Sequence, residues 1–434
     1  MKRKVKIIGG GLAGVEAAYQ LAKRGAKVEL YEMKPVKFSP AHKSAKLAEL
    51  VCSNSLKSIL PDTASGAIKQ EMRLLDSLVI RAGESAAIPA GSALAVDKQL
   101  FSDYIEDVLN SFGNLQIIRE EVTALNPDEY TIVASGPLTS DALAKSIKEL
   151  IKGDYLYFYD AVAPVISYDS IDMENAFFAS RYMKGDADYI NCPLTVDEYD
   201  KFYNALVSAE CVELKEFDKR EIFSGCMPIE VMAKKGYDSI RFGPLKPVGI
   251  KNPLTNENYY AVVQLRKENK SGTMYNMVGF QTNLTYREQK RVFSLIPALK
   301  SAEFLRYGVM HRNTYMNSPY LLDNTLRLKG TNIYFAGQIT GVEGYVESAA
   351  SGLVAGINVF RSLKGIKPLI PGNETITGAL IEYICTENKD FQPMNANFGI
   401  LPKLAHKNKS DRKKEYAVRS EKAMKEYVKE VLND

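Results

Sequence analysis

The sequence predicts an α/β protein with a two-part Rossmann-like nucleotide-binding domain and a smaller α+β domain inserted between the two parts. Two observations carry this prediction. A complete β-α-β unit with a glycine-rich loop lies at residues 5–32, and a strand, a glycine-rich turn and a long helix follow at residues 331–359. Because the chain has 434 residues, of which 46% are hydrophobic, two or three domains are expected. The predicted parts are residues 1–159, 160–300 and 301–434.

The first unit has the order strand, glycine loop, helix, strand, acid. Residues 5–8 and 28–31 are apolar strands, and residues 15–24 have the apolar spacing of a helix. The glycines allow a pyrophosphate to approach the helix N-terminus closely, and Glu32 at the end of the second strand can accept hydrogen bonds from an adenosine ribose. A glycine-rich turn without a ligand is the alternative, but the full context favours dinucleotide binding. The loop consists of Gly9, Gly10, Gly11, Leu12, Ala13 and Gly14.

The later segments indicate which dinucleotide is bound. Residues 130–140 predict a strand that ends in a turn of small residues, and residues 331–359 add another strand, turn and helix. This order is similar to the two-part FAD domain of flavoprotein oxidoreductases, in which the last turn and helix face the flavin. The sequence has no second G-x-G-x-x-G, so a nicotinamide cofactor would reduce the flavin transiently. The candidate flavin contacts in the late turn are Gly337, Gln338, Gly341, Glu343 and Gly344.

Composition excludes several other classes of protein. The net charge of +4 implies no strong global field, although residues 401–434 hold ten Lys/Arg against six Asp/Glu. That basic tail is either a solvated helix face or a contact for phosphates.

Five cysteines without a C-x-x-C pair argue against a disulfide framework and a zinc ribbon, and they fit a reducing cytoplasm. The three histidines have no metal-ligand spacing, and no apolar run is long enough to span a membrane.

Two of the cysteines are candidates for chemistry. Cys226 precedes a helix predicted to start near Pro228, so the helix N-terminus would lower the pKa of its thiol. Cys52 lies within residues 44–58, which predict a short helix that runs into a polar Ser/Asn turn. Because cysteine is most often a small buried hydrophobe, a structural role for either stays open. The cysteines predicted to be structural are Cys192, Cys211 and Cys385.

The middle of the chain has a residue pattern that differs from that of the two nucleotide-binding parts. Residues 154–182 are aromatic-rich and strand-like, and residues 261–284 alternate like a hairpin with its turn near Ser271 and Gly272. These patterns predict the inserted α+β domain. Residues 391–402 are polar and aromatic without periodicity, so they predict an ordered loop. For Cys52 and Cys226 to form one site, the insertion would have to dock onto the flavin-binding face.

Nine blocks of the chain together resemble one family, the FAD- and folate-dependent uracil-5-methyltransferases called TrmFO. They occur in the family's order and cover nearly the whole chain. The blocks are GGGLAGVEAAYQLAKRGAKVELYEM, LAELVCSNSL, PAGSALAVDK, DYLYFYDAVAP, GCMPIEVMAKKG, GPLKPVG, YGVMHRNTYMNSP, FAGQITGVEGYVESAASGLVAG and FQPMNANFGILP.

The resemblance implies a reaction and its residues. NAD(P)H reduces FAD, and the carbon of 5,10-methylenetetrahydrofolate passes to C5 of a uridine, usually in the T-loop of tRNA. Uracil C5 is a poor nucleophile, so a thiolate first adds to C6. The family pattern points to Cys226 as this nucleophile and to Cys52 as the second thiol near the flavin, a base or an alternate nucleophile. The basic residues that could hold RNA phosphates are Lys234, Lys235, Arg241 and the C-terminal tail.

Three alternatives stay open. Some blocks differ from the family pattern, as where Ser224 replaces an acid before Gly225 and Cys226, so large-subunit rRNA is an alternative target of the same chemistry. A flavin-dependent small-molecule or thiol oxidoreductase would favour a close pair of redox cysteines, which is missing. A flavin-containing RNA-binding module without catalysis is disfavoured by the intact blocks around Cys52 and Cys226.

Overall fold

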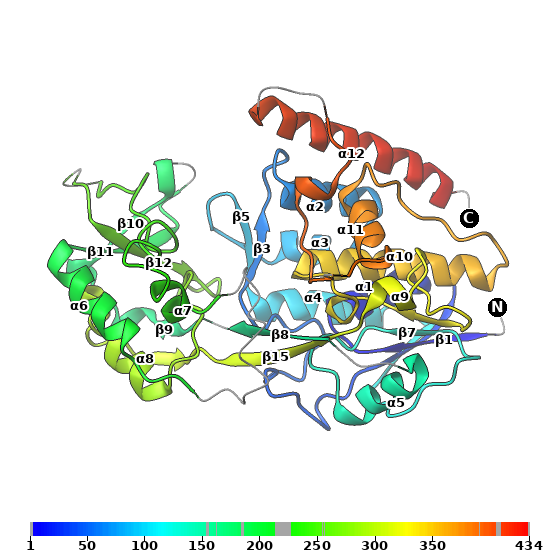
Figure 1. Cartoon of the computed structure of the whole chain (residues 1–434). Coiled ribbons are helices and arrows are strands. Elements are labelled where there is room, and N and C mark those ends of the chain that lie inside the picture. Colours follow the sequence, from blue (N-terminus) through cyan, green and yellow to red (C-terminus); the bar gives the residue numbers. More distant parts are fainter. Residues whose placement is uncertain are drawn as a thin grey trace.

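The computed structural model describes residues 3–152, 156–161, 163–183, 186–212, 227–253, 255, 257–389, 391–404 and 409–432. Figure 1 shows a larger and a smaller lobe. The core of the larger lobe combines residues from Val5 to Ile151 with residues from Tyr315 to Val431, and the second core draws on residues from Ala163 to Ala302. The chain therefore leaves the larger lobe, builds the smaller one and returns.

A five-stranded parallel sheet is the framework of the larger lobe. Its strand order is β16 (Ile333–Phe335), β7 (Thr131–Val133), β1 (Lys4–Ile8), β2 (Lys27–Tyr31) and β6 (Leu115–Ile118). The first two strands of the chain pair in register from Lys4 opposite Lys27 to Ile8 opposite Tyr31. β16 places the C-terminal part of the chain beside β7. The strands predicted in both parts of the chain are thus confirmed, and they share one sheet.

Two helices from distant parts of the chain pack on one side of this sheet. They are α1 (Leu12–Ala22) and α10 (Tyr345–Leu363), and Figure 1 shows α5 (Asp141–Ile151) on the other side. α1 begins three residues earlier than the predicted span of 15–24. A Cβ added to Gly352 of α10 would lie 2.1 Å from the backbone oxygen of Ala13 in α1. The two parts of the nucleotide-binding domain therefore meet backbone to backbone.

The outer helices of the larger lobe gather around a buried carboxylate. Glu71 of α2 (Ala64–Leu74) accepts hydrogen bonds from the amides of Ile376 and Thr377 at 2.6 and 2.9 Å, and from the hydroxyl of Ser420. These partners lie on α11 (Ile376–Cys385) and α12 (Lys409–Leu432), so the basic C-terminal tail contains a helix that docks on α2. The remaining helices are α3 (Leu78–Ser85), α4 (Lys98–Asn110) and α9 (Ser318–Leu321).

The segment before Cys52 is not helical, so the short helix predicted within residues 44–58 is wrong. Residues 45–48 form a bend and a turn instead. The amide of Ala48 donates to the backbone oxygen of Gly10 at 2.8 Å, and Ala48 has a φ of 52°. This contact with the glycine loop overrides the local helical spacing. The chain then enters a small antiparallel sheet of β3 (Ser55–Ser58), β5 (Ala93–Val96) and β4 (Ala87–Ile88).

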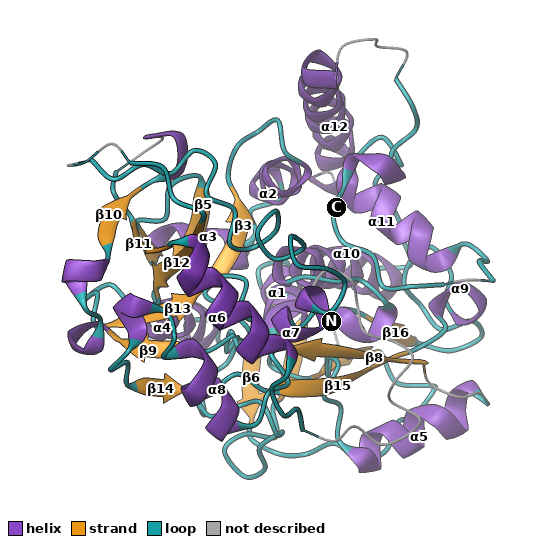
Figure 2. Cartoon of the chain, turned by 60° about the vertical axis from the view of Figure 1, so that its left-hand side comes forward, coloured by secondary structure: helices purple, strands orange, loops and turns teal. Residues whose placement is uncertain are grey.

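The smaller lobe is built on a six-stranded antiparallel sheet. Its order is β10 (Phe177–Ala179), β11 (Tyr189–Leu194), β12 (Ala261–Lys267), β13 (Met274–Met277), β9 (Val165–Ser167) and β14 (Phe304–Arg306). β12 and β13 form the predicted hairpin around Ser271 and Gly272. Figure 2 shows α6 (Val196–Val207) and α8 (Tyr286–Phe293) beside this sheet. The short α7 (Ile229–Ala233) begins directly after Pro228, as predicted.

Two antiparallel strands, β8 (Leu156–Ala161) and β15 (Met310–Tyr315), run between the lobes in Figure 1. The predicted α/β class with an inserted α+β unit agrees with this arrangement. Residues 391–402 form the predicted loop, with one 3-10 turn at Phe398–Ile400. Within the described ranges, the model contains no helix with the length and apolar character needed to cross a membrane.

Candidate active site

A cavity of about 1050 Å³ lies over the carboxyl ends of the parallel strands. Ile8, Tyr31 and Ala134, which end or follow three neighbouring strands, form part of its wall. This is the position at which open parallel sheets bind nucleotides. The predicted cofactor contacts that line it are Gly9, Gly10, Gly11, Leu12, Ala13, Glu32, Gly337 and Gln338.

The glycine loop is shaped by close backbone approaches. Gly9 has a φ of 104°, which side-chain-bearing residues rarely adopt. A Cβ on Gly14 would lie 1.8 Å from the backbone oxygen of Gly9, so α1 starts in contact with the loop. Among the described residues, nothing lies within 4 Å of a Cβ on Gly11. The first turn of α1 also has no side-chain cap, which leaves its amides available to an anion.

Glu32 is nearly buried and already holds the loop. Its Oε2 accepts a hydrogen bond from the amide of Gly10 at 3.0 Å, and its Oε1 accepts one from the amide of Lys34 at 2.9 Å. Each carboxylate oxygen has a further lone pair. Glu32 can therefore orient the loop and still accept hydrogen bonds from ligand hydroxyls.

Four of the predicted contacts do not line this cavity. They are Gly14, Gly341, Glu343 and Gly344. Gly341 has a φ of 86° and faces the ring of Phe391. The carboxylate of Glu343 accepts a hydrogen bond from Nε2 of Gln338 at 2.9 Å, and Gly344 is the N-cap of α10. These three residues shape the turn that leads into α10.

Lys34, His42 and Tyr345 are among the polar residues of the cavity wall that sequence reasoning missed. Nζ of Lys34 lies 3.2 Å from Oε2 of Glu49. Burial, together with the charge of Lys34, lowers the pKa of His42. Lys34 lies two residues after Glu32 and Tyr345 directly follows the late glycine turn, so proximity to the motifs was the available signal for both. His42 had no such signal.

The backbone of Cys52 is attached to the wall of this cavity. The amides of Cys52 and Ser53 donate to the hydroxyl of Tyr345 at 2.7 and 3.2 Å. Tyr345 is the first residue of α10 and lines the cavity. Cys52 itself is partly exposed. A sulfur-bearing residue therefore lies beside the dinucleotide cavity, although the two segments are nearly 300 residues apart in the chain.

Residues 51–54, here called the Cys52 segment, also contact a cluster of charged side chains that come from both lobes. Nζ of Lys98 lies 3.0 Å from Oε1 of Glu268, and Nη2 of Arg306 lies 3.3 Å from the same oxygen. Nη1 of Arg306 donates to the backbone oxygen of Val51 at 3.3 Å. Burial lowers the pKa of the Lys98 ammonium, and the nearby Glu268 and Cys52 oppose that shift.

Asn54, two residues after Cys52, forms hydrogen bonds to both lobes. Its side-chain nitrogen donates to the backbone oxygens of Val96 and Lys267 at 3.1 and 2.8 Å, and its oxygen accepts from Nε of Arg266 at 3.1 Å. Asn54 is fully buried. These hydrogen bonds therefore tie the polar turn around Cys52 to both lobes.

A second cavity, of about 1440 Å³, opens at the junction of the lobes. Glu49 and Val51 line both cavities, so the two adjoin each other. Lys98 and Arg306 line the second cavity as well. The Cys52 segment thus lies between the cavity at the glycine loop and a second cavity that the sequence did not predict.

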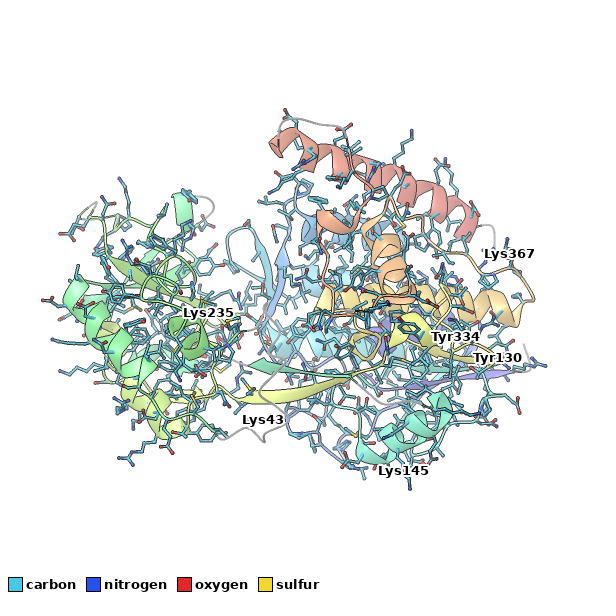
Figure 3. All side chains as sticks on the ribbon, in the orientation of Figure 1. Lys43, Tyr130, Lys145, Lys235, Tyr334 and Lys367 are labelled. Carbon is cyan, nitrogen blue, oxygen red and sulfur yellow. The ribbon has the colours of Figure 1, made fainter. Side chains whose placement is uncertain are left out.

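The basic residues Lys234, Lys235 and Arg241, predicted to hold RNA phosphates, line neither cavity. Cys226 and Ser224 are outside the described residues. Lys234 and Lys235 are exposed at the end of α7, and Figure 3 labels Lys235 on the smaller lobe. The guanidinium of Arg241 is already engaged, because it lies 4.1 Å from the ring centroid of Tyr260 and 3.2 Å from Asp238. The basic tail is α12, on the far side of α2 from the sheet in Figure 1.

The three cysteines predicted to be structural are Cys192, Cys211 and Cys385. Cys192 and Cys385 are buried, and burial raises the pKa of both thiols. Cys211 is half-buried, and burial raises its pKa too. A raised thiol pKa opposes nucleophilic chemistry.

Known proteins share both this sequence and this fold. The family model described as glucose inhibited division protein A (GIDA) matches residues 4–367. A protein from Acetivibrio thermocellus named methylenetetrahydrofolate--tRNA-(uracil-5-)-methyltransferase TrmFO is 55% identical over 428 residues, which cover 98% of each chain. A protein of the same name from Caldicellulosiruptor bescii is 57% identical over 399 residues, which cover 92% of each chain.

A solved structure of Aquifex aeolicus GidA matches the model with a TM-score of 0.72 and 17% identity, covering 99% of this chain and 75% of that one. At that identity the likeness shows the fold alone, and it is the two-lobed fold described above. The near full-length identities are the stronger finding. The chain therefore belongs to the GidA family and, within it, to the TrmFO proteins.

Proposed function

We propose that the chain transfers the carbon of 5,10-methylenetetrahydrofolate to C5 of a uridine in tRNA, with FAD in the first cavity and NAD(P)H as the reductant. The folate, the tRNA and the uracil-5 position in this proposal are taken from the names of its relatives. The observation that carries the proposal is the pair of hydrogen bonds from the Cys52 and Ser53 amides to Tyr345. These bonds hold a cysteine beside the cavity that the glycine loop lines.

The residues of the first cavity fit FAD. The open space at Gly11 and the uncapped first turn of α1 suit a pyrophosphate, and Glu32 suits a ribose. The N-terminus of α10 has no side-chain cap either, and its Tyr345 and Ser348 line the same cavity. When bound, FAD would supply two-electron chemistry, so that NAD(P)H provides the electrons that turn a methylene carbon into a methyl group.

The thiols of the chain would act on the uracil. A thiolate of Cys226 adds to C6, which makes C5 an enolate-like nucleophile for the folate-derived carbon. Cys52 then takes the proton from C5, and the bond between the Cys226 sulfur and C6 breaks. Lys98 and Arg306 place positive charge beside the turn that carries Cys52. The role of Cys226 rests on the resemblance of its motif.

One labelling experiment tests this function. The protein is incubated with NAD(P)H and labelled methylenetetrahydrofolate, together with unmodified tRNA or, separately, with fragments of large-subunit rRNA, and the labelled nucleotide is mapped. We expect label in a T-loop uridine of tRNA and its loss in Cys226→Ala. Label in rRNA alone would move the target to the ribosome. Oxidation of NAD(P)H that ignores both RNA and folate would favour a small-molecule oxidoreductase instead.

A further inference from the structure

One wall of the second cavity is a stack of three aromatic rings. The ring centroids of Tyr286 and Tyr307 are 4.8 Å apart with planes 18° from parallel, and those of Tyr307 and Phe304 are 5.3 Å apart with planes 9° from parallel. All three residues line the cavity. Tyr286 is the outer ring and is 57% exposed. An open ring face at the end of a stack provides a place for one more planar ring.

Cations surround this stack. Lys98 and Arg306 share a single carboxylate oxygen of Glu268, so the pair keeps an excess of positive charge. Among the described residues, none accepts a hydrogen bond from the buried Nε of Arg306. Lys43 is exposed at the rim of the cavity, and Figure 3 places it near the junction of the lobes. The cavity therefore combines an aromatic platform with charge suited to an anion.

The positive surface continues beyond the cavity. Tyr286 is the first residue of α8, and Arg287 and Lys290 on the same helix are exposed. A ligand that ended inside the cavity, such as the tail of a folate, would leave these cations unused. A nucleic acid strand would pass over them as it leaves the cavity. Aromatic faces combined with a basic track are the usual means of binding an unpaired strand.

We propose that the second cavity binds a nucleotide that neighbours the target uridine in the RNA, with its base stacked on Tyr286 and its phosphate against Lys43 and Arg306. The proposal rests on the proposed function above. Arg306 donates to the backbone oxygen of Val51, the residue before Cys52, so the cavity adjoins the thiol. A neighbour held in this way keeps the target base out of its stack while the uracil lies at Cys52.

The test compares RNA binding by four variants of the full-length protein loaded with FAD. Tyr286→Ala removes the platform, Tyr286→Phe keeps its ring, and Lys43→Gln removes one cation. Tyr320→Ala is the matched control, because Tyr320 is 44% exposed and lines neither cavity. Measured quantities are the Kd for an unmodified T-arm RNA at several salt concentrations, the KM for methylenetetrahydrofolate and the melting temperature.

Tyr286→Ala is expected to raise the RNA Kd about 5- to 160-fold, which corresponds to the loss of one stacked base. Tyr286→Phe and Tyr320→Ala should stay within about twofold of wild type. Lys43→Gln should reduce the slope of log affinity against log salt by about 0.7, the value for one phosphate of a single strand. None of these substitutions is expected to change the KM for folate.

An unchanged RNA Kd in Tyr286→Ala, at an unchanged melting temperature, overturns the proposal. A raised KM for folate with an unchanged RNA Kd also overturns it and assigns the cavity to the folate tail. Failure of the proposed function gives a different result, because the wild-type protein would then transfer no label to any RNA.

Discussion

The two cavities that adjoin at Glu49 and Val51 are built from different parts of the polypeptide. The first combines a glycine loop, the start of α1 and a second glycine turn with side chains that include Glu32, Lys34 and His42. The second is lined by side chains that come from both lobes, including Lys98 of α4 and Arg306 of β14. Cys52 lies between them.

The difference shows how this chain separates two tasks. Backbone amides and glycines suit a cofactor whose shape does not vary, and the loop tolerates no added side chain at Gly14, where α1 meets it. Side chains of aromatic and basic type suit a substrate that must enter, be held and leave. Substitutions in the two cavities should therefore impair different properties of the protein.

Cys52→Ala should have the largest effect. Loss of a proton-transferring group typically costs about 10²- to 10⁴-fold in rate, so label transfer to tRNA should fall by about that factor. Because Cys52 does not line the first cavity, the variant should retain FAD, measured by its absorbance. Cys211→Ala, at another partly exposed cysteine, is the control and should transfer label normally. Normal transfer by Cys52→Ala would remove Cys52 from the reaction.

Gly14→Ala should come next. Its Cβ would lie 1.8 Å from the backbone oxygen of Gly9, and backbone cannot move aside as a side chain can. We expect a loss of about 3 kcal/mol in the free energy of unfolding, at the upper end for overpacking, together with lower FAD content. Gly11→Ala is the matched control, because nothing described lies within 4 Å of its Cβ. Denaturant titration of both apoproteins checks this; equal losses would contradict it.

Tyr345→Phe should have a smaller effect, which is confined to the turn at Cys52 and Ser53. The substitution removes the acceptor of the Cys52 and Ser53 amides. Losing such hydrogen bonds costs about 1–2 kcal/mol, so these two amides should exchange with deuterium roughly 5- to 30-fold faster. Tyr334→Phe, which loses a hydroxyl contact to Ser362, should leave their exchange unchanged. Unchanged exchange in Tyr345→Phe would mean that the turn is held by Asn54 alone.

A pH effect should be the smallest. Burial and the charge of Lys34 lower the pKa of His42 in the folded protein. As pH falls below the ordinary histidine value of about 6.5, the unfolded chain therefore takes up a proton that the folded chain does not, and the stability of the folded state decreases. The decrease ends once the pH passes below the folded pKa. His42→Gln should flatten the melting temperature between about pH 7 and pH 5 relative to wild type; an equally steep curve would exclude His42 as the cause.

Local sequence predicted most of the first cavity and little of the second. The glycine loop, its strands and Glu32 are contiguous, so spacing alone indicates their geometry. The short helix expected before Cys52 failed because the amide of Ala48 bonds to Gly10, a contact between segments almost 40 residues apart that local spacing does not register. The Glu268 cluster and the aromatic stack left no sequence signal for the same reason.

The sequence by itself determined the dinucleotide fold, the late glycine turn, the hairpin of the inserted domain and, through its motif blocks, the family. These depend on short-range periodicity and on where glycine is needed, and both can be read in the sequence. Only the tertiary structure decided that Tyr345 holds Cys52, that Asn54 joins the lobes, and that Lys98, Glu268 and Arg306 meet beside the thiol. Hydrogen bonds and ion pairs between distant segments depend on docking of the two lobes, which no stretch of sequence encodes alone.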